Sequence, residues 1–248
     1  MAALTAGAGI IGTLAASKRA REACFFLWWS TFGLSNKLDV ITRSQSLELL
    51  ATAGPLSGRV LEVGSGDGVR LPYLCGLKQP AVTEVVCVEP NTLMHAALRQ
   101  KMEEVHADAL QAGISDLRLT LFEGTLEEYA AQHSGSVFDV IATLLVLCSV
   151  PEGPREALSS CAKLLRPSGR LLYLEHVRGR SRGLRLAQRT IQPVYSLFGD
   201  GCDLCRDTGG AIDLVSGEHG WRKVHHVEST VVGGLLPLVC GVCEAPAK

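Results

Sequence analysis

The sequence predicts an α/β fold with a doubly wound, mostly parallel sheet, and three observations carry this prediction. Five short apolar segments end in turn residues, which is typical of buried parallel strands. Helix-like segments separate these strands, and such alternation favours a doubly wound sheet. A glycine-rich segment at 64–68 directly follows the first strand, at a position where such sheets bind ligands.

The expected parallel strands cover 59–63, 84–88, 117–122, 137–143 and 170–174, and two late strands cover 222–228 and 238–244. The longest expected helix covers 92–111, and its inner side is predicted to carry Leu93, Ala96, Ala97 and Met102. A helix over 154–165 is expected to stop before Pro167-Ser168-Gly169, a run that cannot continue a helix. We expect one domain over 37–248, an N-terminal segment over 1–36 and a cap-like insertion near 178–218.

Composition restricts the class of protein. The 248 residues include 24 Lys and Arg against 25 Asp and Glu, a balance that argues against a nucleic-acid partner. Hydrophobic residues at 47% and charged residues at 20% exclude a disordered chain. The nine cysteines are odd in number and follow no secreted-scaffold spacing. We therefore expect a reducing, intracellular compartment.

The segment LEVGSGDG at 61–68 is the most informative motif. Its glycines are spaced G-x-G-x-G, whereas a dinucleotide-binding loop has G-x-G-x-x-G and directs a helix N-terminus at a pyrophosphate. S-adenosylmethionine (SAM) has no phosphate, and glycines allow the backbone to approach its methionine portion closely. We expect this portion to contact Gly64, Ser65, Gly66 and Gly68, and Glu62 to bind its ammonium group directly or through water.

A second acid follows roughly 20 residues later, which is the spacing expected of an adenosine-binding site. Glu89 lies at the end of the second strand, before Pro90. A carboxylate there accepts hydrogen bonds from both ribose hydroxyls. We expect Glu89, with Pro90 beside it, to contact the ribose.

The later strands supply the remaining candidate contacts. The loop after the third strand lies beside the adenine in this fold, so Gly124, Thr125 and Leu126 are candidates for contacting it. The carboxyl end of the fourth strand opens into the ligand crevice, where Thr143 and Leu144 are candidates for lining the methyl-transfer site.

Four motifs occur in order over 58–177, namely LEVGSGDG, VEP, FDVIATLLVLCSV and LLRPSGRLLYLEH. Together they resemble class I SAM-dependent methyltransferases. The segments at 89–91, 143–150, 165–169, 175–177 and 200–202 more narrowly resemble the small membrane-associated methyltransferases of alkyl thiols. This resemblance implies a Rossmann-like seven-stranded sheet with an antiparallel last strand, SAM as cofactor and a small-molecule acceptor. No obligate protein partner is expected. The chain differs from the family pattern at Ser65, Asp67, Glu89 and Thr125.

Methyl transfer from SAM is an in-line displacement on an activated methyl group, so the protein mainly supplies position and electrostatics. A thiol attacks as its thiolate and has an ordinary pKa of about 8.5, so a nearby weak base is enough. The candidate bases are His176 and Glu175, just past the fifth strand, with Asp200 and Cys202 as further candidates from the cap. A carbon, nitrogen or oxygen acceptor, or a SAM-binding module without turnover, remains open.

Two CxxC pairs, at 202–205 and 240–243, raise the question of a zinc site. The 34 residues between them exceed a common zinc spacing of about 15–20. The odd spacing of Cys240 and Cys243 in an expected strand also places their side chains on opposite faces. We therefore expect no metal.

The N-terminal segment allows three interpretations. Residues 2–16 carry no charge, three basic residues follow at 18–21, and an apolar cluster covers 25–29. This order suits a membrane-associated segment of endoplasmic reticulum type, an organelle transit peptide, or a helix that covers the core. The arginines at 178, 180, 182, 185 and 189 suit either a solvated helix face or contact with anionic lipid. The expected location is accordingly a membrane, the cytosol or an organelle.

Overall fold

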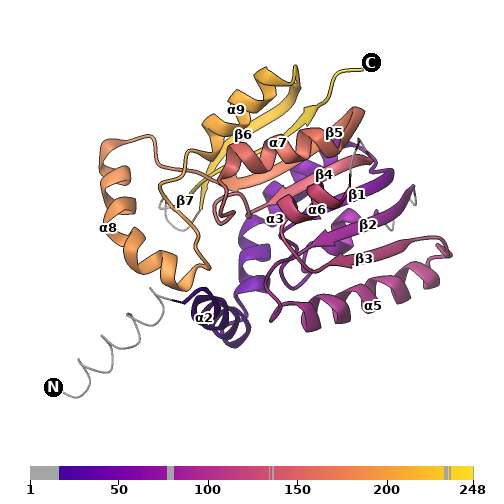
Figure 1. Cartoon of the computed structure of the whole chain (residues 1–248), viewed down its shortest axis with the longest axis horizontal. Helices are drawn as coiled ribbons and strands as arrows, with labels where there is room; N and C mark the ends of the chain where they lie inside the picture. The colour runs from indigo at the N-terminus through magenta and orange to yellow at the C-terminus, as the bar shows by residue number, and fades with distance from the viewer. Residues whose placement is uncertain are drawn as a thin grey trace.

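The computed structural model describes residues 17–76, 81–133, 135, 137–231, 234 and 236–247. Within them the strands form one sheet in the order β3-β2-β1-β4-β5-β7-β6, as Figure 1 shows. The strands are β1 (Gly58–Val63), β2 (Val82–Val88), β3 (Arg118–Phe122), β4 (Phe138–Leu144), β5 (Leu165–His176), β6 (Arg222–Val231) and β7 (Leu236–Glu244).

Strand direction confirms the predicted mostly parallel sheet. β1 pairs in parallel with β2 and β4, and β3 and β5 extend the sheet in parallel on either side. The last strand, β7, lies between β5 and β6 and is antiparallel to both. Because β1 to β5 run in one direction, their carboxyl ends meet at one edge, where ligands bind in such sheets.

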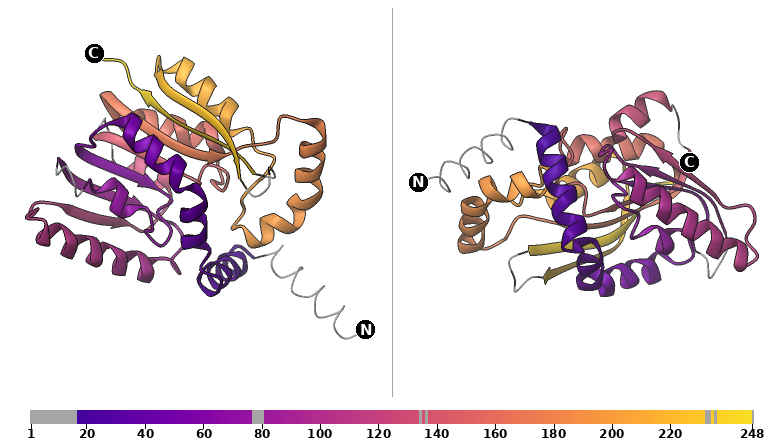
Figure 2. Two further views of the ribbon diagram at one scale, coloured as in Figure 1. Left: turned by 180° about the vertical axis from the view of Figure 1, so that it is seen from behind. Right: turned by 90° about the horizontal axis from the view of Figure 1, so that it is seen from below.

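Two helix layers cover the sheet, as Figures 1 and 2 show. One face packs against α6 (Leu126–Gln132), α7 (Pro154–Leu164) and α9 (Thr208–Glu218), and the other against α3 (Leu34–Ala53), α4 (Leu71–Leu74) and α5 (His95–Gln111). The alternation of strand side chains divides the core. Val60 packs in the cluster that contains Leu49 of α3, while Leu61 packs in the cluster that contains Leu158 of α7.

Two further helices lie outside these layers. α2 (Lys18–Thr31) and α8 (Arg182–Phe198) pack on one another, and the rings of Trp28 and Phe198 meet at a centroid distance of 6.3 Å. α9, which belongs to the region expected to form the cap, packs instead against α7 in a helix layer.

The three interpretations of the N-terminus rest mainly on residues 2–16, which lie outside the described part of the chain. In the part that is described, none of the helices combines the length and apolar character needed to cross a bilayer.

Several local predictions differ from the structure. The fifth strand covers Leu165–His176, so Glu175 and His176 lie within it and not just past it. The boundary expected at Pro167-Ser168-Gly169 is displaced, because α7 ends at Leu164 and β5 already begins at Leu165. These residues form an irregular strand entry, where Ser168 has a φ of 58° and the pairing with β4 shifts register.

The predicted inner side of α5 is also wrong in part. Leu93 precedes the helix and is exposed, and Ala96 is exposed as well. The buried positions of α5 are His95, Leu98, Val105 and Ala109. The helix therefore begins later than expected, and its buried face is rotated.

Candidate active site

The glycine loop is fixed against the second strand and against the segment after β4. The N–H groups of Gly64 and Ser65 both donate to the Val88 carbonyl, at 2.8 and 3.2 Å. Gly64 has a φ of 67°, and a Cβ atom there would lie 2.2 Å from Cγ2 of Val146. Glycine is therefore required at this position for both its backbone conformation and the close approach.

Glu89 joins the predicted ribose site to this loop. Its carboxylate accepts the N–H of Gly66 at 2.7 Å and the N–H of Asn91 at 2.8 Å. Burial raises the pKa of Glu89, and these two hydrogen bonds lower it again. A Cβ atom on Gly66 would meet no atom within 4 Å, so the loop surface beside the carboxylate is open.

Glu62 is a second buried acid at the carboxyl end of β1. Its residue is 2% exposed, and burial raises the pKa of its carboxyl group to about 7. Arg70 lies near enough to lower that pKa, but its guanidinium donates to the hydroxyls of Ser46 at 2.9 Å and Thr42 at 3.0 Å. A cationic ligand beside Glu62 would stabilise its ionised form.

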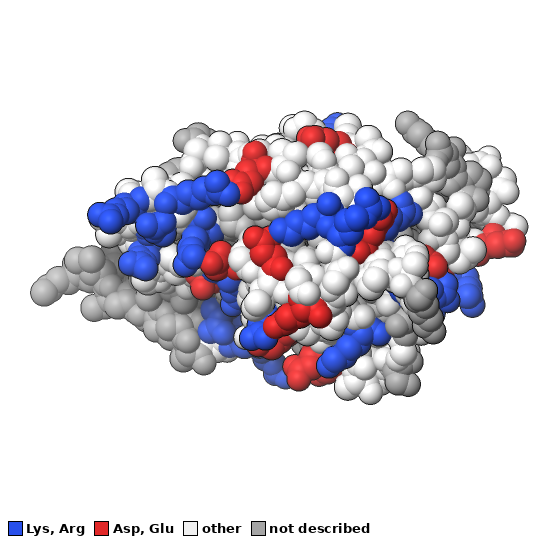
Figure 3. Space-filling view, turned by 90° about the horizontal axis from the view of Figure 1, so that it is seen from above, with Lys and Arg blue, Asp and Glu red and all other residues white. Residues whose placement is uncertain are grey.

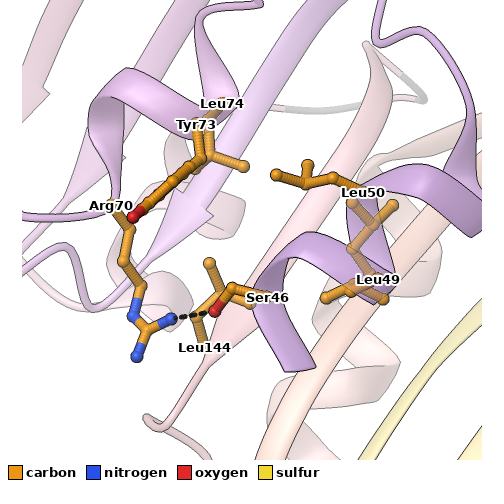
Figure 4. Close-up of a pocket in the computed structure, with 8 residues that line it drawn as sticks. Ser46, Leu49, Leu50, Arg70, Tyr73, Leu74 and Leu144 are labelled. Atoms are coloured by element: carbon orange, nitrogen blue, oxygen red, sulfur yellow. Dashed lines mark hydrogen bonds between the residues drawn. The ribbon is translucent and has the colours of Figure 1, made fainter. Parts of the chain in front are cut away.

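Figure 4 shows Arg70 and Ser46 at the wall of a small cavity between α3, α4 and the sheet. The side chain of Leu144 lines this cavity too. The sequence singled out Leu144 as a cofactor contact, and the structure shows that its side chain contributes to this cavity.

The acids and the open loop suit SAM as a ligand. An ammonium group matches a buried carboxyl group such as Glu62, and a ribose diol matches the carboxylate of Glu89. The arrangement of these residues is therefore compatible with SAM, and their individual contacts with it stay predictions.

The residues after β3 already have structural partners. Thr125 is the N-cap of α6, because its hydroxyl accepts the Glu128 N–H at 3.2 Å and the Glu128 carboxylate accepts the Thr125 N–H at 2.7 Å. Leu126 is buried in the core, and Gly124 packs closely against Phe122. Their contact with adenine stays a prediction.

The other predicted cofactor contacts differ in their packing and in how deeply they are buried. Gly68 packs against Leu98 and Lys101 of α5, and Ser65 is buried with its hydroxyl 3.4 Å from the Glu62 carbonyl. Thr143 is completely buried, whereas Pro90 is exposed.

Glu175 holds the segment that follows β4. Its carboxylate is fully buried and accepts the N–H groups of Val146 and Leu147, each at 3.1 Å from Oε2. Leu145, just before them, has a φ of 64°, a conformation that costs a non-glycine residue on the order of 1 kcal/mol or more. Burial raises the pKa of Glu175 well above its ordinary value. These contacts are those of a positioning group, and a role of Glu175 as a base stays a prediction.

His176 lies in a buried cluster with two cysteines. Its Nε2 is 2.8 Å from the sulfur of Cys202, which is 3.0 Å from the sulfur of Cys148. The hydrogen bond from Cys202 lowers the pKa of Cys148. All nine cysteines are free thiols.

The two CxxC pairs do not form a joint site within the described residues. Cys240 donates to the Gln45 carbonyl and Cys243 contacts Ser216, whereas Cys202 belongs to the cluster with His176. The sequence therefore identified Cys202 but not its partner Cys148.

The residues after α8 and the helix α2 both reach the cofactor edge. Asp200 lies 3.4 Å from the side-chain amide of Asn91, the residue that donates to Glu89. Burial raises the pKa of Asp200. From α2, the indole N–H of Trp29 donates to Asp67 in the glycine loop at 3.0 Å. No sequence pattern indicated these contacts of Trp29 and Asn91, because they join segments far apart in the chain.

Comparison with known proteins agrees with this geometry. Residues 39–228 match the family model described as a methyltransferase domain. Rat thiol S-methyltransferase TMT1B is 32% identical over 167 residues, which cover 66% of this chain and 61% of that protein. Human thiol S-methyltransferase TMT1A is 28% identical over 196 residues, covering 79% and 72%. The chain thus spans about six tenths of the length of the rat relative.

A relative with a different acceptor in its name is nearly as similar. The ubiquinone biosynthesis O-methyltransferase of Cronobacter sakazakii is 31% identical over 153 residues, covering 61% of this chain and 56% of that protein.

Solved structures show the same fold at low identity. An O-methyltransferase family protein from Burkholderia thailandensis superimposes with a TM-score of 0.61 at 17% identity, over 94% of this chain and 62% of that one. A geranyl diphosphate methyltransferase in complex with SAM gives 0.57 at 11% identity, over 82% and 84%.

The raised pKa of Glu62 predicts how pH changes the stability of the ligand-free protein. A carboxyl group with a folded pKa of about 7 and an unfolded pKa near 4.5 contributes stability below pH 4.5 that is lost as the pH rises through 7. Glu62→Gln removes this loss, so the variant should be the more stable protein at pH 8, by up to about 3 kcal/mol, with little difference at pH 4.5.

Urea unfolding at several pH values measures this difference. Glu103→Gln, at an exposed position of α5, is the matched control and should follow the wild type throughout. A Glu62→Gln effect that is equal at pH 4.5 and pH 8 would contradict the assigned pKa.

Proposed function

Because this chain belongs to the methyltransferase-domain family and SAM is its cofactor, we propose that it transfers a methyl group to the sulfur of a small apolar thiol. The proposal concerns the acceptor. Its support is the thiol S-methyltransferase relatives together with the residues on the acceptor side of the site.

The cofactor supplies an activated methyl group when it is bound. On the protein side, Glu62 binds the ammonium group and Glu89 binds the ribose hydroxyls. The N–H of Gly66 keeps Glu89 in place, so the two acids hold a fixed relation to the loop. The chain's contribution is therefore mainly orientation, which is worth several kcal/mol in a bimolecular displacement.

The observation that carries the thiol proposal is the segment 145–148. It begins with the half-buried apolar residues Leu145 and Val146, and it ends at Cys148 beside His176. The carboxylate of Glu175 fixes the backbone of this segment, because it accepts the N–H groups of Val146 and Leu147. An apolar surface with soft and weakly basic groups suits an uncharged alkyl thiol better than a strongly polar acceptor.

Methylation of a phenolic or quinol oxygen is the second candidate. The similarity to a ubiquinone biosynthesis O-methyltransferase favours it, and the same apolar segment suits such an acceptor. A carbon or nitrogen acceptor, or SAM binding without turnover, has no further support in the contacts of the site.

A panel of acceptors tests the proposal. The purified protein is given radiolabelled SAM with a short alkyl thiol, a phenol or a reduced quinone, and methylated products are identified by mass spectrometry. We expect at least tenfold more product from the thiol than from the other two. Glu89→Ala should give background levels, because it lacks the ribose acid, while Glu103→Ala should keep the wild-type rate.

Two results of this panel would contradict the proposal. Preferential methylation of the quinol or the phenol would favour the second candidate. Binding of SAM with no methylation of any acceptor would favour a binding module.

We also propose that α2 and α8 contact a membrane surface. Large apolar side chains are exposed on both helices, among them Leu27 at 66% and Leu186 at 67%. Of the arginines in 178–189, Arg178 and Arg180 pair with acids, whereas Arg182 and Arg189 are exposed beside Leu186 on α8. Figure 3 shows basic side chains on the side of the molecule where α8 lies. Exposed apolar residues flanked by arginine suit an anionic lipid surface.

Sedimentation with vesicles of phosphatidylcholine and phosphatidylserine tests this contact. We expect binding that high salt weakens, and a several-fold loss in the Leu186→Glu, Val194→Glu double variant. Leu214→Glu, at an exposed apolar position of α9, is the control and should bind as the wild type does. Equal sedimentation of all three proteins would exclude α8 from the contact.

A further inference from the structure

We infer that Cys148, His176 and Cys202 form a binding site for a thiophilic divalent cation of the zinc class, with one coordination position left for the acceptor thiol. The second part of this inference rests on the proposed thiol acceptor. The first part stands on the cluster alone.

The three side chains converge from separate parts of the chain. Cys148 follows β4, His176 ends β5, and Cys202 follows α8. One ligand atom from each lies within 4.8 Å of the others, and all three residues are buried. Two thiols and an imidazole brought together from three segments form a preorganised set of donor atoms.

The separations between the ligand atoms of the cluster are comparable to those between ligands of a bound zinc ion. Zinc binds sulfur at about 2.3 Å and nitrogen at about 2.0 Å, so tetrahedral ligands lie about 3.8 Å (sulfur to sulfur) and about 3.5 Å (sulfur to nitrogen) apart. The observed distances are 3.0 Å between the sulfurs and 2.8 Å from Cys202 to His176. To admit the ion, these two pairs of ligand atoms would have to separate by about 0.7–0.8 Å.

The number of ligands indicates the kind of site. Structural zinc sites have four protein ligands, whereas catalytic ones have three and keep a position open for water or substrate. Within the residues that the structure describes, the group contains three. Two thiolates also balance the charge of a divalent cation, which makes burial of the ion favourable.

Two short stretches of the chain connect the cluster to the edge of the sheet where the cofactor is expected to bind. Asp200 contacts Asn91, whose N–H binds Glu89, and Cys202 follows Asp200 by only two residues. Two residues span at most about 7 Å. On the other side, Val146 touches the glycine loop at Gly64, and Cys148 again follows by two residues. The ion would therefore lie next to the region where the methyl group is presented.

Such a site would convert the acceptor thiol to its thiolate, which is the form that attacks the methyl group. A thiol that coordinates the cation loses its proton to solvent and is held as the thiolate. The new sulfur–carbon bond forms as the sulfonium–methyl bond of SAM breaks. The products are the methyl thioether and S-adenosylhomocysteine, and the cation keeps its charge throughout.

Metal content provides the first test and needs no activity. The full chain is purified with a phosphine reductant, equilibrated with Zn²⁺, passed through gel filtration and analysed by mass spectrometry of the metal. We expect about one Zn²⁺ per chain in the wild type and less than a tenth of that in Cys148→Ser and Cys202→Ser. Cys161→Ser is the matched control, a buried cysteine of α7 outside the cluster, and should retain the ion. Absence of Zn²⁺ from the wild type, or equal retention in all variants, would overturn the site.

Cobalt substitution tests the open position. Addition of a short alkyl thiol to the Co²⁺-loaded protein, without SAM, should strengthen the sulfur-to-cobalt absorption bands, and an alcohol of the same shape should not. An unchanged spectrum with the thiol would overturn the open position. A spectral response without methylation in the acceptor panel would instead remove the proposed function and leave the metal site standing.

Discussion

The site depends on the placement of one carboxylate. Glu89 directly follows β2, and its two oxygens accept the N–H groups of Gly66 from the neighbouring loop and of Asn91 from its own turn. This pair of bonds fixes the glycine loop relative to the second strand, and it partly offsets the rise in the pKa of Glu89 that burial causes. Parallel pairing of β1 with β2 brings the two strand ends together. The sheet topology therefore places the proposed cofactor residues next to each other.

A second buried acid organises the acceptor side in the same way. Glu175 lies near the end of β5 and accepts the backbone N–H groups of the two residues that follow Leu145, which has a left-handed conformation. Val146 then touches Gly64, and Cys148 reaches His176. The two acids therefore position the loops of β1 and β4 against each other. The proposed acceptor chemistry concerns residues that these loops carry.

Local patterns were enough to predict the sheet and its ligand edge, because strands, turns and the glycine loop are encoded within a few residues. The same reasoning predicted roles for Glu62, Glu89 and His176, and the structure places all three at buried positions at the carboxyl ends of the strands. It assigned Glu175 as a base because position after a strand does not show that backbone N–H groups surround the carboxylate. It placed Leu93 on a buried face because the helix start at His95 depends on Asn91 and its turn. The contacts of Trp29 with Asp67 and of Cys148 with Cys202 join distant segments, so no local spacing could indicate them.

The dissociation constant of SAM measured by calorimetry tests the central role of Glu89 most directly. If Glu89 binds the ribose hydroxyls, Glu89→Gln should weaken SAM binding at least tenfold, or by about 1.4 kcal/mol. A cooperative thermal unfolding transition of the variant shows that it is folded. Glu103→Gln should bind as the wild type does. A folded Glu89→Gln protein that binds SAM with the wild-type dissociation constant would contradict the account.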